Sequence, residues 1–169
     1  FHDWNARITA ECYAANARAR VLDEEGRIAR LTNNFSFLSF NIGPTLFAWL
    51  DRNAPATARR IIAAARDSAE RFSGHGNAIA QAYNHMILPL AAPRDRWTQI
   101  RWGIREFQAR FHRSPEAMWL PETAVDTATL GLLADAGMRY VILSPAQAAR
   151  WRPLGERAWR PAADGEVDP

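Results

Sequence analysis

The sequence predicts an α/β fold in which short parallel strands alternate with helices. The first observation is the order of patterns along the chain: strand, helix, strand, helix, strand, helix, strand. The second is that the apolar runs are short and the amphipathic segments between them can cover them, as in βαβ units. The third is size, because 169 residues that are 48% apolar suffice for one domain with a core. Right-handed crossovers would form either an open doubly wound sheet or part of a barrel.

The N-terminal third is predicted to contain a helix, a hairpin and the first strand of the sheet. Residues Trp4–Arg20 have a helical composition, and VLDEEGRI after them predicts a small hairpin that turns at Asp23–Gly26. The Phe-rich run Phe35–Asn41 mostly alternates with Ser, which favours a strand. Gly43-Pro44 ends that strand, and TLFAWLD then begins a helix.

The central part is predicted to hold a helix, the second strand and a further helix. Pro55 suits a first helical turn, and apolar residues follow it at helical spacing as far as Phe72. Asn77–Tyr83 is the second strand candidate. Apolar residues at helical spacing mark the next helix over Trp97–Phe111, with Asp95 as its expected N-cap.

The C-terminal part is predicted to hold two strands around one helix. AMWL, Ala117–Leu120, is the third strand, and Thr123 with Asp126 fits a capping box for the helix after it. Gly137 should stop that helix. Its expected buried face comprises Leu130, Leu133 and Ala134. The run RYVILSP gives the clearest strand of all, Arg139–Pro145. The polar tail from Trp151 to Pro169 indicates a loop or the start of another element.

Composition argues against several classes of protein. All 21 basic residues are Arg and the net charge is only +3, with the arginines scattered, so we expect no nucleic-acid surface. No apolar run approaches the ~20 residues of a membrane span, so we expect no membrane partner. Cys12 is the only cysteine, and no metal-ligand spacing such as H-x-x-x-H occurs. We therefore expect no metal, no other cofactor and a cytoplasmic protein.

Polar and aromatic residues gather where the predicted strands end. Asn41 ends the first strand, Asn84 and His85 follow the second, and Trp119 and Glu122 lie at the end of the third. A βα fold binds its ligands beyond the carboxyl ends of its strands. We therefore predict that Glu122 belongs to a functional site. The predicted substrate-binding residues, all on the same face of the fold, are His75, Asn84, His85, Trp119 and Asn41.

Each of these residues also has a purely structural interpretation. Glu122 in a first helical turn would complement the helix dipole. A histidine in a loop is more often solvated or hydrogen-bonded than a ligand. Trp119 could belong to the core, although an indole beside a carboxylate could equally serve as a platform for a sugar ring.

Several stretches, in the right order, resemble glycoside hydrolase family 57. NNFSFLSFNIGPTLFAWL is similar to the second-strand region of the family, and AGMRYVILSP to a later strand. GHGNAIAQAYNHMILPL resembles the second conserved motif, in which a His precedes an Ile-Leu-Pro-Leu run, and MWLPE resembles the third. The segment Pro89–Asp126 more narrowly resembles the bacterial α-amylase/α-mannosidase-like branch.

The resemblance implies a partial (β/α)7 barrel. The His-Gln-Pro type motif of the family's first strand has no counterpart here, and nothing after Pro145 resembles the motif that holds its general-acid Asp. We therefore expect residues 1–169 to be a fragment of a single catalytic barrel that lacks the first strand and the C-terminal strands. Such a fragment should be inactive by itself.

The resemblance also implies a mechanism. Glu122 matches the nucleophile of a retaining glycoside hydrolase or transglycosylase that acts on α-glycans, of the amylase, glucanotransferase or branching-enzyme type. The partner would be an oligo- or polysaccharide. His85 matches the histidine of the second motif and would bind a sugar hydroxyl or steady developing charge. Pro121 would break the strand so that the Glu122 side chain turns toward the cleft, with Leu120 held extended.

Two other functions stay open at this point. One is a metal-dependent polysaccharide deacetylase-like enzyme of the wider (β/α)7 group, which needs an Asp and two His as ligands. The other is a non-catalytic carbohydrate-binding relative. The type of glycosidic linkage, and the choice between hydrolysis and transfer, are not determined by the sequence.

Overall fold

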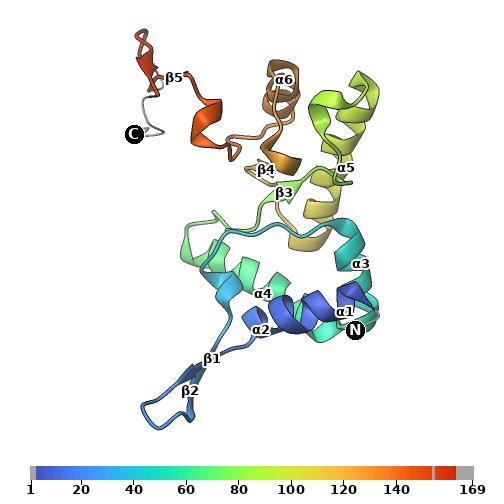
Figure 1. The fold of residues 1–169 in the computed structure, drawn as a ribbon, viewed down its shortest axis with the longest axis vertical. Coiled ribbons are helices and arrows are strands. Elements are labelled where there is room, and N and C mark those ends of the chain that lie inside the picture. Colours follow the sequence, from blue (N-terminus) through green and yellow to red (C-terminus); the bar gives the residue numbers. More distant parts are fainter. Residues whose placement is uncertain (1–2, 154, 163–169) are drawn as a thin grey trace.

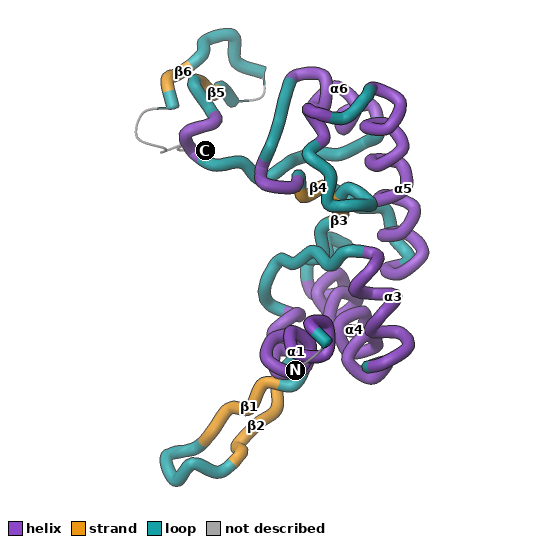
Figure 2. The backbone as a smooth tube through the Cα atoms, turned by 45° about the vertical axis from the view of Figure 1, so that its right-hand side comes forward, coloured by secondary structure: helices purple, strands orange, loops and turns teal. Residues whose placement is uncertain are grey.

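Four extended segments run parallel to one another, in the order in which they occur in the chain. The structure, a computed structural model, describes residues 3–153 and 155–162. Phe40 pairs with Ala78, β3 (Ala80–Gln81) pairs with β4 (Met118–Trp119), and Ala117 pairs with Tyr140, all in parallel. Figures 1 and 2 show β3 and β4 side by side at the centre of the molecule. This arrangement confirms the predicted α/β class.

The helices lie between these segments in the predicted order. The N-terminal helical region comprises α1 (Trp4–Ile8), a π-helical turn (Thr9–Tyr13) and α2 (Ala14–Ala17). Between the later segments lie α3 (Pro44–Asn53), α4 (Pro55–Arg71), α5 (Pro93–Phe111) and α6 (Thr127–Asp135). Short 3-10 turns occupy Asn34–Ser36, Leu88–Leu90, Pro121–Thr123 and Pro145–Gln147. Among the described residues, no helix is long and apolar enough to cross a membrane.

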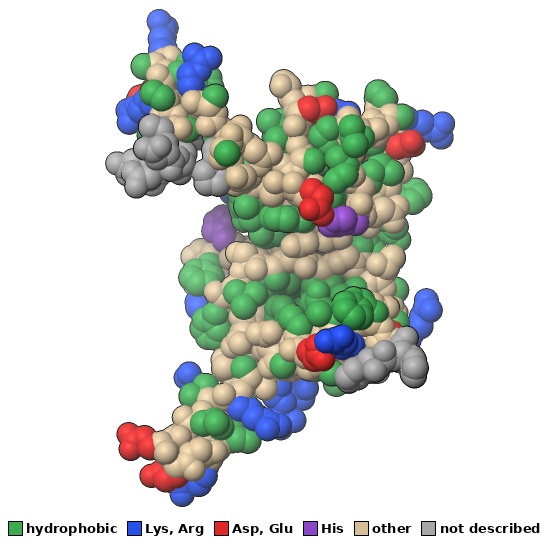
Figure 3. All heavy atoms as spheres, viewed as in Figure 1, with side chains coloured by type: hydrophobic (Ala, Val, Ile, Leu, Met, Phe, Trp, Pro, Cys, Tyr) green, Lys and Arg blue, Asp and Glu red, His purple; other side chains and the backbone are tan. Residues whose placement is uncertain are grey.

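Two antiparallel pairs stand apart from the parallel segments. The predicted hairpin is confirmed as β1 (Ala19–Leu22) and β2 (Ile28–Thr32), and both views show it projecting from the body. Several charged side chains gather on the tip of this hairpin, whereas apolar and uncharged side chains dominate the centre of the face in Figure 3. In the tail, β5 (Arg150–Trp151) pairs with β6 (Arg160–Pro161), and residues 163–169 of the predicted tail lie outside the described residues.

The first and the fourth predicted strands are much shorter than expected. Phe35 lies in a 3-10 turn, because the Asn33 side chain accepts a hydrogen bond from the Phe35 N–H (3.2 Å) and caps that turn. Only Phe40 of this run pairs with a neighbouring segment in the described structure. In the run 139–145, Tyr140 alone forms a bridge, and Tyr140 and Ile142 are exposed. Apolar content predicted these strands, but a ladder requires a paired neighbour.

The expected caps of two helices were also wrong. Pro93 begins α5 after Ala92, so Asp95 lies inside the first turn and is not the N-cap. Asp126 is itself the N-cap of α6, and its carboxylate accepts the Thr129 N–H (2.7 Å). Thr123 instead has a left-handed backbone (φ 53°).

The start of α6 at Thr127 also changes its buried face. The face contains Thr129 and Leu133, whereas Leu130 and Ala134 are exposed. The helix ends where predicted, since Gly137 adopts φ 85° directly after the last turn.

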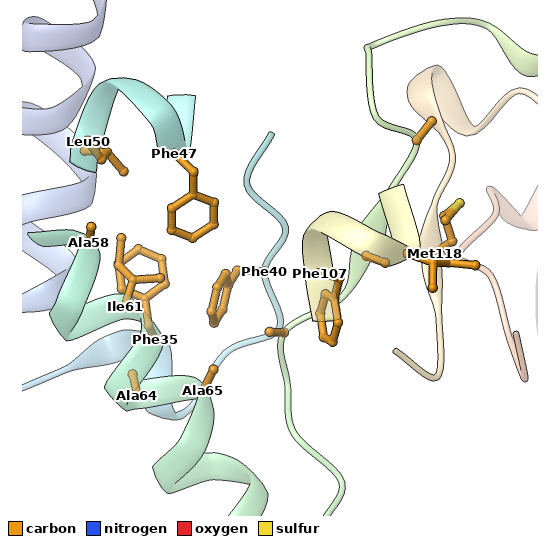
Figure 4. Packing of buried hydrophobic residues seen from close by; sticks show 14 of the residues in the cluster. Phe35, Phe40, Phe47, Leu50, Ala58, Ile61, Ala64, Ala65, Phe107 and Met118 are labelled. Carbon is orange, nitrogen blue, oxygen red and sulfur yellow. The ribbon is translucent and has the colours of Figure 1, made fainter. Parts of the chain in front are cut away.

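Aromatic rings join the first segment to the helices. Phe40 meets Phe35 edge to face (centroids 5.0 Å apart) and Phe111 of α5 (6.2 Å). Figure 4 shows Phe40 between the α3–α4 side of the core and Phe107, with Met118 beyond. The aromatic cluster therefore binds the first extended segment to α5, and it fixes where the segment's carboxyl end emerges.

Gly103 allows α5 to lie directly on β3. A Cβ atom at this position would sit 2.0 Å from the Gln81 carbonyl oxygen, which is far inside van der Waals contact. The helix backbone can therefore approach the strand backbone closely only because residue 103 has no side chain. This contact fixes the position where β3 ends and where the loop of residues 82–87 begins.

Candidate functional site

Glu122 stands on a strained turn immediately after β4. Leu120 is extended (φ −95°, ψ 125°), as expected for a residue before proline, and Pro121 ends the strand. Glu122 and Thr123 then both adopt left-handed backbone conformations (φ 55° and 53°). Such a conformation costs an L-residue roughly 1–2 kcal/mol. Its main effect is to direct the Glu122 side chain out of the sheet, so that 72% of it is exposed.

Hydrogen bonds within the turn and one from Gln147 hold it in place. The Thr123 N–H donates to the Leu120 carbonyl (2.9 Å), and the Ala124 N–H donates to that of Pro121 (3.1 Å). Gln147 supplies a contact from the far end of the fourth segment. Its side-chain N–H donates to the Thr123 carbonyl (2.8 Å), while its Oε1 accepts the Ser144 N–H (2.8 Å). The amide therefore ties two strand ends together behind Glu122.

His85 is the direct partner of Glu122. The His85 Nε2 lies 3.0 Å from the Glu122 Oε1, although the two residues are 37 positions apart in the sequence. His85 comes from the loop after β3, and Glu122 from the turn after β4, so parallel pairing of the strands brings them together. When Nε2 carries the proton, the imidazole donates to the carboxylate and orients it. Both side chains are open to solvent and to a ligand.

An ion pair between the nearly buried Arg96 and the partly exposed Asp126 links the two loops behind these residues. The Arg96 side chain, 9% exposed, donates to both carboxylate oxygens of Asp126 (3.1 Å each) and to the Pro89 carbonyl (3.0 Å). Pro89 follows His85 and Asp126 follows Glu122 in the chain. Hydrogen bonds from Thr129, together with the Arg96 charge, hold the pKa of Asp126 below its ordinary value. The pair is therefore charged at neutral pH and constrains the spacing of both loops.

The other residues that were predicted at the carboxyl ends of the strands lie near the His85–Glu122 pair. Asn41 donates its side-chain N–H to the Gln81 Oε1 (2.6 Å), which joins the ends of the first two segments. The backbone N–H of Asn84 donates to the Gln99 side chain (2.6 Å) and leaves the Asn84 amide exposed. Trp119, half-buried, is in register with Gln81 and so lies on the same face of the ladder. The structure thus places Asn41, Asn84, His85, Trp119 and Glu122 at the carboxyl ends, and their roles stay predictions.

The position predicted for His75 was wrong. Its Nδ1 lies 2.9 Å from a carboxylate oxygen of Glu116, which in turn accepts from Arg139 (2.7 Å). All three residues precede their extended segments, so they lie at the amino ends of the sheet, opposite Glu122. His75 follows α4 and lies in the loop that leads into the second extended segment, not in a loop that follows a strand. His75 is therefore separate from the site around Glu122.

Glutamine side chains are the residues that sequence reasoning missed. Gln81 of β3 bonds to Asn41, Gln99 of α5 bonds to Asn84, and Gln147 joins the Thr123 turn to Ser144. Their partners are between 3 and 40 positions away in the sequence, so no local motif marks them. Across residues 3–153 and 155–162, no three His, Cys, Asp or Glu side chains gather as ligands for a metal ion.

Comparison with known proteins adds a family and two relatives. The model of the family described as glycosyl hydrolase family 57 matches residues 7–151. Alpha-amylase 1 of Dictyoglomus thermophilum is 28% identical over 102 residues, which make up 60% of this chain and 14% of that protein. The chain therefore spans only a small part of this relative.

A solved structure is similar to this chain in fold. The 4-alpha-glucanotransferase from Thermococcus litoralis matches with a TM-score of 0.53 and 17% sequence identity. The match covers 66% of this chain and 17% of that chain. The parallel segments and their helices are thus similar in fold to part of a larger protein.

Proposed function

Because the chain belongs to glycosyl hydrolase family 57, we propose that it forms part of an enzyme that cleaves or transfers α-glycosidic bonds, with Glu122 as the nucleophile. The observation that supports this role best is the pairing of Glu122 with His85 at the carboxyl ends of two neighbouring parallel strands. That edge is where βα folds place their ligands. The four parallel segments would be part of a (β/α)7 barrel.

The proposed reaction proceeds through a covalent intermediate. The Glu122 carboxylate attacks the anomeric carbon and forms a glycosyl ester, while a second carboxyl group protonates the departing oxygen. Water or a sugar hydroxyl then attacks the ester, which gives hydrolysis or transfer respectively. By resemblance to the family, the second carboxyl group is an Asp outside this chain. The names of two relatives, an alpha-amylase and a 4-alpha-glucanotransferase, support an α-glucan as the substrate.

Two features of this chain would support that chemistry. The left-handed turn at Glu122 presents the carboxylate to the solvent side with its backbone already fixed, so little ordering is needed on binding. His85 holds one carboxylate oxygen and leaves the other free to attack. Asn41, Asn84 and Trp119 would contact the sugar hydroxyls and ring faces around the reacting bond.

The test is substitution of Glu122 in the complete protein. We expect Glu122→Ala to lose nearly all turnover of an aryl α-glucoside, and azide to restore part of it by replacing the missing nucleophile. Glu116→Gln is the matched control, because this carboxylate lies at the amino ends of the same strands and should not affect the reaction. Full turnover in Glu122→Ala, with unchanged folding, would remove Glu122 from the mechanism.

A further inference from the structure

A groove with a volume of about 320 Å³ lies beside the His85–Glu122 pair. It is lined by His85, by the hydrogen-bonded pair Asn41 and Gln81, and by Tyr13 of the N-terminal helical region. This volume is within the ~300–1,000 Å³ typical of small-molecule sites. Since His85 contacts Glu122 directly, a molecule in the groove would lie next to the proposed nucleophile.

The lining of the groove selects against charged ligands. Among the described residues, no Arg, Asp or Glu lines it. Its polar side chains are the amides of Asn41, Gln81 and Asn84, the hydroxyls of Tyr13, Thr45 and Tyr83, and the His85 ring. Amides and hydroxyls offer both donors and acceptors, as sugar hydroxyl groups do. A phosphate or carboxylate would lose its hydration here without meeting a cationic side chain.

Tyr83 adds an aromatic surface to the same groove, and α5 fixes its position. The Tyr83 N–H donates to the Gln99 carbonyl (3.1 Å), which anchors the backbone to the helix. Trp102 meets the Tyr83 ring edge to face, with centroids 5.5 Å apart and planes at 85°. An aromatic ring held in this way can pack against the C–H face of a sugar with little loss of side-chain entropy.

We propose that this groove is a subsite for an uncharged glycosyl unit, adjacent to the unit that Glu122 attacks. Tyr83 contacts the sugar ring, and Trp102 acts as a positioning residue behind Tyr83. The inference rests on the proposed function for the identity of the glycan. It goes further by assigning a second sugar position and by naming two residues that sequence reasoning did not select.

Binding of maltotetraose tests the subsite. The affinity is measured by calorimetry on the complete protein carrying Glu122→Gln, which prevents turnover. We expect Tyr83→Leu to weaken binding about tenfold and Trp102→Ala about threefold. Trp97→Ala is the matched control, since Trp97 is on the same helix and similarly exposed (52% against 54%) but lies beside a different hollow, between α5 and α6. Inorganic phosphate should not compete with maltotetraose.

Kinetics separate this inference from the proposed function. An α-glucosyl fluoride places one sugar ring at Glu122 and only a fluoride leaving group beyond it. In the complete protein with Glu122 intact, Tyr83→Leu should therefore leave its turnover unchanged while raising KM for maltotetraose. Three results would overturn the subsite. Tyr83→Leu could bind maltotetraose as tightly as the Glu122→Gln parent, Trp97→Ala could weaken binding as much as Tyr83→Leu does, or the parent could fail to bind maltotetraose. Absence of α-glucosyl fluoride turnover in the complete protein with Glu122 intact would instead count against the proposed reaction. Thermal unfolding of each variant identifies changes that only disturb folding, and Tyr83→Phe then serves as the second variant, with near-parental affinity expected.

Discussion

Replacement of Gly103 by alanine should weaken the fold, although alanine is the better helix former. The new Cβ would lie 2.0 Å from the Gln81 carbonyl oxygen and 3.3 Å from the Tyr83 nitrogen, whereas ordinary contact begins at 3.4 Å. The first neighbour is backbone, so no side chain can rotate away, and α5 must move off β3. Overpacking of this kind, which forces backbone shifts, costs about 1–3 kcal/mol and occasionally more.

The net effect combines two opposing terms. Alanine stabilises the interior of a helix by about 1 kcal/mol relative to glycine. We therefore expect a net loss of about 2 kcal/mol in the free energy of unfolding, with the clash at the upper end of its range. For a chain of this length that corresponds to a fall in Tm of roughly 4–8 °C.

Gly131→Ala is the matched control for this experiment. Gly131 lies inside α6 and is exposed, and a methyl group added to it would meet no atom within 4 Å. The same substitution should raise stability there by about 0.5–1 kcal/mol. Thermal and urea unfolding of both variants, followed by circular dichroism, measures the difference. Equal or greater stability of Gly103→Ala than the parent would refute the proposed close contact between α5 and β3.

Two further predictions concern opposite ends of the sheet. Gln147→Leu removes the bond to the Thr123 carbonyl and should lower kcat on an aryl α-glucoside about tenfold with little change in KM, because the turn that presents Glu122 loses a support; an unchanged kcat would contradict this role. At the amino ends, the hydrogen bond from His75, and then that from Arg139, hold the pKa of Glu116 below its ordinary value. This contribution to stability is therefore present above the ordinary carboxyl pKa of about 4.3 and is lost as pH falls through the lowered pKa of the folded state. Unfolding measured from pH 7 to pH 3 should show a shallower acid loss in Glu116→Gln than in the parent, and parallel curves would exclude the effect.

Local patterns in the sequence determined the order of the elements and much of the helix extents. Pro55 and Gly137 mark helix ends by their own backbone preferences, and the turn at Asp23–Gly26 marks the hairpin. Pro121 likewise ended β4 and kept Leu120 extended. These features depend on interactions between residues a few positions apart, so a single sequence contains the information they need.

Tertiary contacts decided which of the apolar runs became strands. The run at 139–145 had the strongest strand pattern, yet only Tyr140 pairs within the described structure. Strand formation depends on a hydrogen-bonded neighbour, and the sequence does not state where that neighbour lies. The same reason explains Phe35, whose backbone is held in a turn by Asn33 and whose ring packs in the core.

For the candidate site, too, some features follow from local sequence and others from the tertiary structure. The sequence by itself indicated Glu122 and His85 as residues that follow strands, because position after a strand is a local property. Only the tertiary structure decided that their side chains meet at 3.0 Å, that His75 lies at the opposite end, and that Gln147 supports the turn. Those facts depend on the register of parallel strands whose partners are about 40 residues apart, and register is set by packing such as that of Gly103 on Gln81.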